Sequence, residues 1–184
     1  MKVITGLLKG RNILGYNIDG TRPTMDRVKM SIFSMINDHI NNNIVLDLFS
    51  GSGNYGIEAI SEGAKLAYFN DYNKECIKVI NKNINNFDIK DKSIILNMDY
   101  QKCLKYLKDS NIKLDLVFLD PPYKERIIES IMIFLLDNNL LNKNAYIIAE
   151  FEGDKLNSNY DNLLLKKSRK YGKKEVYIYE YKGE

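Results

Sequence analysis

The feature that most constrains the fold is a regular alternation between short apolar segments and amphipathic helical segments. From residue 44 onwards, each of four apolar segments is followed by a stretch with helical spacing: IVLDLF, LAYFND, SIILNMD and LDLVFLD. Continuous apolar strands that alternate with helices predict a mostly parallel, doubly wound α/β sheet covered on both faces. A fifth strand, AYIIAEF, precedes LLLKKSRKYGKKEVYIYEY. This last segment is typical of two strands joined by a turn at Gly172 and predicts an antiparallel edge.

The segment before this core is predicted to add a hairpin and one helix. MKVITGLLKGRNIL is typical of two short strands around Gly6–Gly10. After a loop that ends at Pro23, Thr24 is placed to cap a helix over residues 25–40, in which apolar residues recur at helical spacing.

The chain has the size and pattern of one domain. It contains 184 residues with no internal repeat and no linker, so we expect a single domain over 1–184, with an extension over 1–23 and a core over 24–184. The apolar stretches near the N-terminus and in IMIFLL are too short for a secretory signal or a membrane span. These features predict a soluble, cytoplasmic protein, and we expect a monomer.

The composition leaves little material for several kinds of catalytic site. Cys76 and Cys103 lie far apart within helical patterns, and His39 is the single histidine. We therefore expect reduced thiols, no metal site and no histidine-dependent triad. The net charge is only +3, but basic residues cluster in the first thirty residues and in KKSRKYGKK. Such clusters indicate either contact with a polyanion or solvated surface lysines.

A glycine loop follows the first apolar segment. Gly51, Gly53 and Gly56 have the spacing of a dinucleotide-binding fingerprint, which by itself is a weak signal. Asp47 lies four residues before Gly51, where its carboxylate would repel the pyrophosphate of NAD(P) or a flavin. S-adenosylmethionine carries two cationic groups and no phosphate, so it suits an acidic surrounding. An NAD(P)-dependent oxidoreductase remains the alternative that the glycines allow.

Two further acids end the next apolar segments. In open α/β sheets the ligand binds outside the carboxyl ends of the strands. Asp71 is placed to accept hydrogen bonds from both ribose hydroxyls, a role shared by nucleoside cofactors of either kind. Asp99 is placed to accept from the adenine amino group, to cap the following helix, or to do both.

The fourth apolar segment carries the predicted chemistry. Asp120, Pro121, Pro122 and Tyr123 resemble the (D/N/S)-P-P-(Y/F/W) motif of methyltransferases that act on exocyclic or amide nitrogens. An exocyclic amine is a poor nucleophile because its lone pair is delocalised into the base. A carboxylate that accepts the N–H bond counters the positive charge that develops during methyl transfer. The prolines restrict the backbone, and the tyrosine offers a face on which the base stacks.

Several segments together resemble the RsmD-type family of bacterial methyltransferases: MKVITGLLKGRNIL, TRPTMDRVKMSIFSMI, VLDLFSGSGNYGIEAISEGA, FLDPPY and RKYGKKEVYIYEY. Members of this family methylate N2 of one guanine, guanine 966, in 16S ribosomal RNA. The resemblance runs nearly from end to end. It implies a seven-stranded class I methyltransferase fold with an N-terminal β-hairpin extension, S-adenosylmethionine as cofactor, and the assembled or assembling small ribosomal subunit as partner. The family usually carries Glu where this chain has Asp71.

The resemblance also assigns residues to roles. It implies cofactor contacts from Asp47, Phe49, Gly51, Ser52, Gly53, Asp71, Tyr72, Asp99 and Tyr100. It places Lys9, Arg11, Arg22, Thr24 and Arg27 on the substrate side. The KKSRKYGKK turn either meets phosphates or is an exposed hairpin tip. A DNA adenine-N6 methyltransferase shares the DPPY motif and stays as an alternative, although a chain of 184 residues leaves little room for a target-recognition segment.

Overall fold

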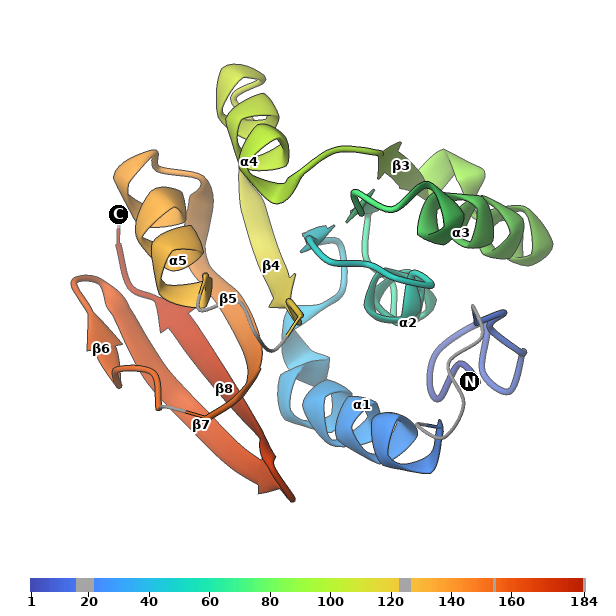
Figure 1. Cartoon of the computed structure of the whole chain (residues 1–184), viewed down its shortest axis with the longest axis horizontal. Coiled ribbons are helices and arrows are strands. Elements are labelled where there is room, and N and C mark those ends of the chain that lie inside the picture. The colour runs from blue at the N-terminus through green and yellow to red at the C-terminus, as the bar shows by residue number, and fades with distance from the viewer. Residues whose placement is uncertain (16–21, 123–126, 154, 184) are drawn as a thin grey trace.

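The fold is built on one mixed β-sheet, seen here in a computed structural model that describes residues 1–15, 22–122, 127–153 and 155–183. The strands are β1 (Ile44–Asp47), β2 (Leu66–Asn70), β3 (Ser93–Leu96), β4 (Leu114–Leu119), β5 (Leu141–Glu152), β6 (Asn159–Tyr160), β7 (Leu163–Tyr171) and β8 (Lys174–Tyr181). They lie in the order β3-β2-β1-β4-β5-β8-β7-β6 (Figure 1). The first five strands along the chain pair in parallel, whereas β8, β7 and β6 pair antiparallel.

Helices cover both faces of the sheet, as the alternation of apolar segments predicts. They are α1 (Arg22–Ile36), α2 (Asn54–Ser61), α3 (Lys74–Phe87), α4 (Tyr100–Asp109) and α5 (Ile128–Asp137), with 3-10 turns at Asn37–His39 and Lys90–Lys92. Helices α1, α2 and α3 pack on one face, and α4 and α5 on the other (Figure 1). Neighbouring strand residues point to opposite faces, so Val45 joins the first core and Leu46 joins the second.

Of three sequence predictions about the sheet, one needs correction and two are confirmed. The resemblance implies seven strands, but the described part of the chain has eight, because Asn159–Tyr160 adds a two-residue strand beside β7. The turn at Gly172 is confirmed, and its positive φ of 63° explains why glycine suits that position. The mostly parallel sheet with an antiparallel edge is confirmed.

The N-terminal segment does not form the two predicted strands. Residues 1–15 contain a single antiparallel bridge, between Lys2 and Asn12, that closes a loop. The backbone N–H groups of Ile4 and Thr5 donate to the side chain of Glu58, both at 2.8 Å, and so are not available to a cross-strand ladder. We call residues 1–13 the N-terminal loop.

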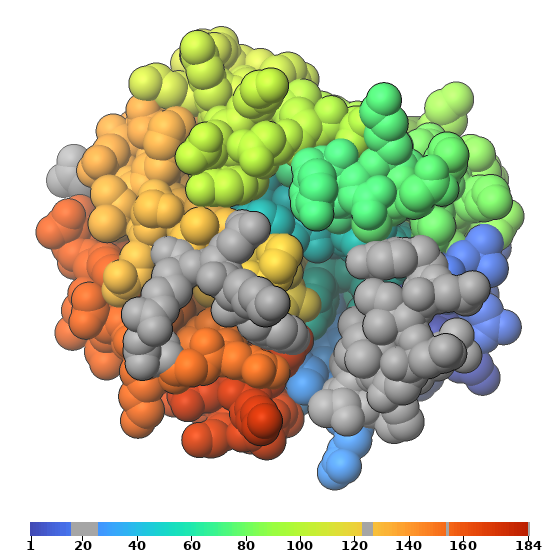
Figure 2. Space-filling view, viewed as in Figure 1, coloured from blue at the N-terminus to red at the C-terminus, as the bar shows by residue number. Residues whose placement is uncertain are grey.

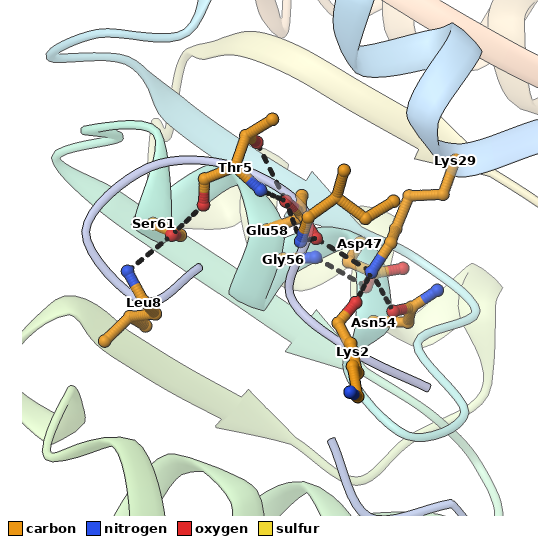
Figure 3. A network of polar contacts seen from close by, with 10 residues as sticks. Lys2, Thr5, Leu8, Lys29, Asp47, Asn54, Gly56, Glu58 and Ser61 are labelled. Carbon is orange, nitrogen blue, oxygen red and sulfur yellow. Dashed lines mark hydrogen bonds and ion pairs between the residues drawn. The ribbon is translucent and has the colours of Figure 1, made fainter. Parts of the chain in front are cut away.

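A buried ion pair fastens the N-terminal loop to the core (Figure 3). Lys29 Nζ of α1 lies 2.7 Å from Glu58 Oε2 of α2, and both side chains are fully buried. Lys29 also donates to the carbonyl of Lys2 and to Asn54 Oδ1, each at 2.7 Å. Because donors surround the Glu58 carboxylate and acceptors surround the ammonium, the cost of burying the two charges is offset by hydrogen bonds.

Candidate functional site

A cleft of about 650 Å³ opens where β1, β2, β3 and β4 end. This is the edge at which open α/β sheets bind ligands. Of the predicted site residues, the cleft is lined by Phe49, Gly51, Asp71, Tyr72, Asp99, Tyr100, Asp120, Pro121 and Pro122. Figure 2 shows the segment after β4, in yellow, near the centre of this face and next to the teal segment that follows β1. The fold therefore brings together residues that are up to 73 positions apart (Phe49 to Pro122).

The glycine loop has the geometry that close backbone packing requires. Gly51, with a φ of 56°, donates its N–H to Asp71 Oδ2 at 2.9 Å. Gly56 lies in the first turn of α2 against β2, and a Cβ there would come within 2.3 Å of the Phe69 ring. The loop thus joins the ends of β1 and β2 and leaves one side of Gly51 facing the cleft.

Asp47 lies beneath the glycine loop and is not among the residues that line the cleft. Its Oδ2 accepts the N–H of Gly56 at 3.0 Å, and the side chain is buried. Burial raises the pKa of Asp47 to about 7, against the lowering effect of that hydrogen bond. Ser52 and Gly53 also lie away from the cleft lining. In the structure these three residues belong to the glycine loop and its support and not to the lining of the cleft.

The two predicted nucleoside carboxylates both face the cleft and both organise backbone. Asp71 accepts the N–H of Gly51 on Oδ2 and the N–H of Asn73 on Oδ1, each at 2.9 Å. Asp99 is the N-cap of α4 and accepts the N–H of Gln101 at 2.8 Å. An ionised carboxylate has about four acceptor sites, so each side chain keeps capacity for a ligand.

Asp120 lies at one end of a chain of polar side chains that was not predicted from the sequence. Its Oδ1 lies 3.4 Å from Lys174 Nζ, which donates to Glu150 Oε2 at 2.6 Å. Tyr55 donates its hydroxyl to Glu150 Oε1. Burial, followed by the charge of Glu150, raises the pKa of Asp120, and Lys174 lowers it. One signal was present in the sequence: a glutamate inside the apolar strand AYIIAEF is expected to have a buried partner.

An aromatic stack fixes the far end of this chain. The Tyr55 ring lies 4.9 Å from the Phe118 ring at an interplanar angle of 8°. Burial raises the pKa of Tyr55 well above its usual value, so its hydroxyl stays a neutral donor. The position of the Glu150 carboxylate is thereby defined by packing as well as by hydrogen bonds.

Three of the residues predicted on the substrate side, Lys9, Arg11 and Arg27, lie away from the cleft lining. Lys9 and Arg11 are exposed on the N-terminal loop, and Arg27 is exposed on α1. The Arg11 guanidinium stacks 4.7 Å from the centroid of the Phe87 ring. The side chains of Arg22 and Thr24, and all of Tyr123, fall outside the described residues.

Three other expectations concern the cysteines, metal ligation and membrane spans. Cys76 and Cys103 are both buried. The described residues contain no group of three His, Cys, Asp or Glu side chains that is arranged to hold a metal ion. Among the helices that the structure describes, none combines the length and the apolar character needed to cross a membrane.

The sheet order and the position of the cleft define the class of protein: the fold is that of the S-adenosylmethionine-dependent methyltransferases. An Escherichia coli structure, yhhF, provisionally described as a methyltransferase, superposes with a TM-score of 0.87 at 24% identity, covering 100% of this chain and 99% of that chain. A second structure, SMU.776, carries the same provisional description and is complexed with SAH. It superposes with a TM-score of 0.66 at 18% identity, covering 96% of this chain and 51% of that chain.

Sequence comparison identifies the family. The model of a family described as conserved hypothetical protein 95 matches residues 1–180. YlbH of Bacillus subtilis, provisionally named an rRNA methyltransferase, is 32% identical over 184 residues, which is 100% of both chains. Ribosomal RNA small subunit methyltransferase D of Haemophilus influenzae is 33% identical over 183 residues, which is 98% of this chain and 93% of the relative. The chain belongs to this family, the RsmD and YlbH family, and the predicted resemblance is confirmed.

Proposed function

We propose that the protein transfers a methyl group from S-adenosylmethionine to the exocyclic N2 of a guanine in small-subunit ribosomal RNA. The observation that carries the proposal is the placement of Asp120 in the same cleft as Asp71 and Asp99. In this arrangement Asp120 would accept the N–H bond of the target amine beside two carboxylates that would bind a cationic nucleoside. Membership of the RsmD and YlbH family supports the same reaction.

The charges of the described cleft fit the proposed methyl donor. Asp71, Asp99 and Asp120 are the ionisable carboxylates that line it, and no Lys or Arg of the described residues does so. When bound, S-adenosylmethionine supplies a methyl group on a positively charged sulfur. Asp71 would hold the ribose hydroxyls and Asp99 the adenine amino group. The N-terminus of α2 already has a carboxylate partner in Asp47, which disfavours a diphosphate there and hence an NAD(P)-dependent oxidoreductase.

Asp120 would act on the nucleophile. Its side chain is 25% exposed, so one part faces the cleft while another meets Lys174. Accepting an N–H bond from the guanine N2 would favour the pyramidal nitrogen and counter the growing positive charge, an effect typically of about 10²–10⁴-fold. Pro121 and Pro122 restrict the adjacent backbone, and Tyr123 would stack on the base.

The proposed substrate is 16S ribosomal RNA within the small subunit, at guanine 966, and the proposed place of action is the cytoplasm, where that subunit is made. Relatives named ribosomal RNA small subunit methyltransferase D support the rRNA class. Lys9, Arg11 and Arg27 would contact phosphates at some distance from the cleft, because their side chains are exposed outside it. The target base would leave its stack to reach Asp120, at a cost of a few kcal/mol.

The test is a labelled-methyl assay on three kinds of nucleic acid. Tritiated S-adenosylmethionine is incubated with the protein and unmodified small subunits, naked 16S RNA or DNA, and the products are digested to nucleosides. We expect N2-methylguanosine from the subunits, little from naked RNA and none from DNA. Methyladenosine from DNA would instead support a DNA adenine-N6 methyltransferase, and no labelled product from any substrate would refute the proposal. Isothermal titration with NADH and with S-adenosylmethionine tests the oxidoreductase alternative, which requires that the protein bind NADH.

A further inference from the structure

Four side chains form a continuous polar chain from α2 to the end of β4. Tyr55 of α2 donates to one oxygen of Glu150, in β5, and Lys174 donates to the other at 2.6 Å. Lys174, at the start of β8, also lies 3.4 Å from Asp120 Oδ1. The ammonium therefore lies between a buried carboxylate and the carboxylate at the cleft.

We propose that Lys174 is a positioning residue for Asp120, which it bridges to Glu150 and thereby holds at the cleft to receive the target amine. This inference rests on the proposed function, because that function makes Asp120 the acceptor of the amine N–H bond. Lys174 lies outside the DPPY motif, 54 positions after Asp120 in the sequence.

The sheet gives Lys174 a defined direction toward Glu150. Strands β5 and β8 pair antiparallel, with Glu152 opposite Lys174 and Glu150 opposite Val176. Lys174 and Glu150 are thus diagonal neighbours, a distance that a long side chain can span. Glu150 is only 2% exposed, and donors occupy both of its oxygens. Such an anchor restrains the lysine, whose own side chain is 15% exposed.

The charges around Asp120 give the bridge a chemical consequence. Within the described residues, the ionisable groups that act on Asp120 include Glu150 of β5, Lys174 of β8, Asp47 of β1 and the Tyr55 hydroxyl of α2. Burial and the two acids favour the protonated form of Asp120, and Lys174 favours the ionised form. A protonated carboxyl is a weaker acceptor for the amine, so loss of Lys174 should remove activity most strongly at low pH.

The experiment compares pH profiles of methyl transfer to small subunits at saturating S-adenosylmethionine. For Lys174→Met, the acidic limb of kcat should move up by about one pH unit or more, because an opposite charge within ~4–6 Å typically lowers a carboxyl pKa by about 1–3 units. Lys174→Arg should restore the wild-type limb. Glu150→Gln, which removes a negative charge, should move the limb down. Lys78→Met is the matched control, because Lys78 is an exposed lysine on α3, paired with Glu75.

Opposite shifts for Lys174→Met and Glu150→Gln support the proposal, since loss of a merely structural contact would lower activity equally at every pH. A uniform loss, or shifts in the same direction, would overturn it.

A ¹³C NMR titration of the Asp120 carboxyl, assigned with Asp120→Asn, gives the same comparison without turnover. If the wild-type protein methylates no substrate but the pKa of Asp120 shifts in the variants as expected, the proposed function fails. The inference that Lys174 links Asp120 to Glu150 is then still supported. If Lys174→Met does not fold, Glu150→Gln and Lys174→Arg decide by the same titration, and an unmoved Asp120 titration in Glu150→Gln overturns the bridge.

Discussion

The Oδ2 atom of Asp47 accepts the backbone N–H of Gly56 at 3.0 Å, which ties the end of β1 to the first turn of α2. This bond places a side-chain carboxylate at the helix N-terminus where dinucleotide-binding folds hold a pyrophosphate. The same glycine spacing thus occurs with dinucleotides and with S-adenosylmethionine. An acid at position 47 disfavours the dinucleotide, because its carboxylate repels the pyrophosphate. Burial, against the opposing effect of this bond, raises the pKa of Asp47 and makes it a titrating group within the core.

Asp47→Asn should change the pH dependence of stability. Burial raises the pKa of Asp47 in the folded chain to about 7, and the usual value for an aspartate is about 3.9. Between these values the folded state binds more protons than the unfolded state, so the free energy of unfolding falls as pH rises toward about 7. Asn cannot titrate and can still accept the Gly56 N–H bond. In urea unfolding, the variant should therefore lose less stability than wild type over this range, by at most about 1.4 kcal/mol per pH unit. Parallel curves for the two proteins would refute the buried titration.

Gly56→Ala should destabilise the fold through packing. A Cβ at this position would lie 2.3 Å from one carbon of the Phe69 ring and 2.7 Å from another, so the ring or the helix must move. Overpacking of this kind typically costs about 1–3 kcal/mol. Gly15→Ala is the matched control, since among the described residues its Cβ would meet just the end of the Met1 side chain, at 3.9 Å. Urea unfolding measures both, and equal stabilities would contradict the packing argument.

The Lys29–Glu58 pair should be strongly coupled in stability. Either Lys29→Met or Glu58→Gln leaves a buried polar group without its main partner, and breaking a buried ion pair typically costs about 3–5 kcal/mol. The double variant removes both charges and should be less destabilised than the sum of the single variants. A double-mutant cycle by urea unfolding checks this, and strict additivity would mean that the two side chains do not interact. The single variants should also expose the N-terminal loop to proteolysis, because Lys29 and Glu58 bind its backbone.

Asp120→Asn should reduce methyl transfer and preserve cofactor affinity. Loss of the charged acceptor should lower kcat by about 10²–10⁴-fold, whereas Asp71 and Asp99 still face the cleft. Product formation on small subunits and calorimetric titration with S-adenosylmethionine separate the two effects. Turnover near the wild-type rate would exclude Asp120 from the chemistry, and a parallel loss of affinity would assign it to cofactor binding instead.

The sequence predicted the features that depend on local pattern. Apolar segments that alternate with helices give the parallel sheet, and acids that directly follow those segments must meet at one edge of it, as Asp71, Asp99 and Asp120 do. The Pro-Pro step after Asp120 marked the end of β4. These predictions needed only the direction of the chain and the period of its apolar residues.

The contacts that the sequence did not predict depend on long-range register. Lys174 reaches Glu150 because β8 pairs antiparallel with β5 in one particular alignment, and a shift of one residue would turn the lysine to the opposite face. Lys174 lies within KKSRKYGKK, where it cannot be distinguished from its solvated neighbours. The prediction of an N-terminal hairpin was wrong for a related reason. The sequence does not reveal that the Glu58 carboxylate accepts the backbone N–H groups of Ile4 and Thr5.

Substitutions in the N-terminal loop test whether it contacts RNA. If Lys9 and Arg11 each meet a phosphate, Lys9→Ala and Arg11→Ala should each reduce the slope of log affinity against log salt by about 0.7–0.9. Arg11 also stacks on Phe87, so Arg11→Lys separates the loss of charge from the loss of packing. Filter binding of small subunits at several salt concentrations measures the slope, with Lys78→Ala as an exposed-lysine control. An unchanged slope in both alanine variants would show that the loop does not contact RNA. Its contacts with Lys29 and Glu58 would then indicate a purely structural role for the loop.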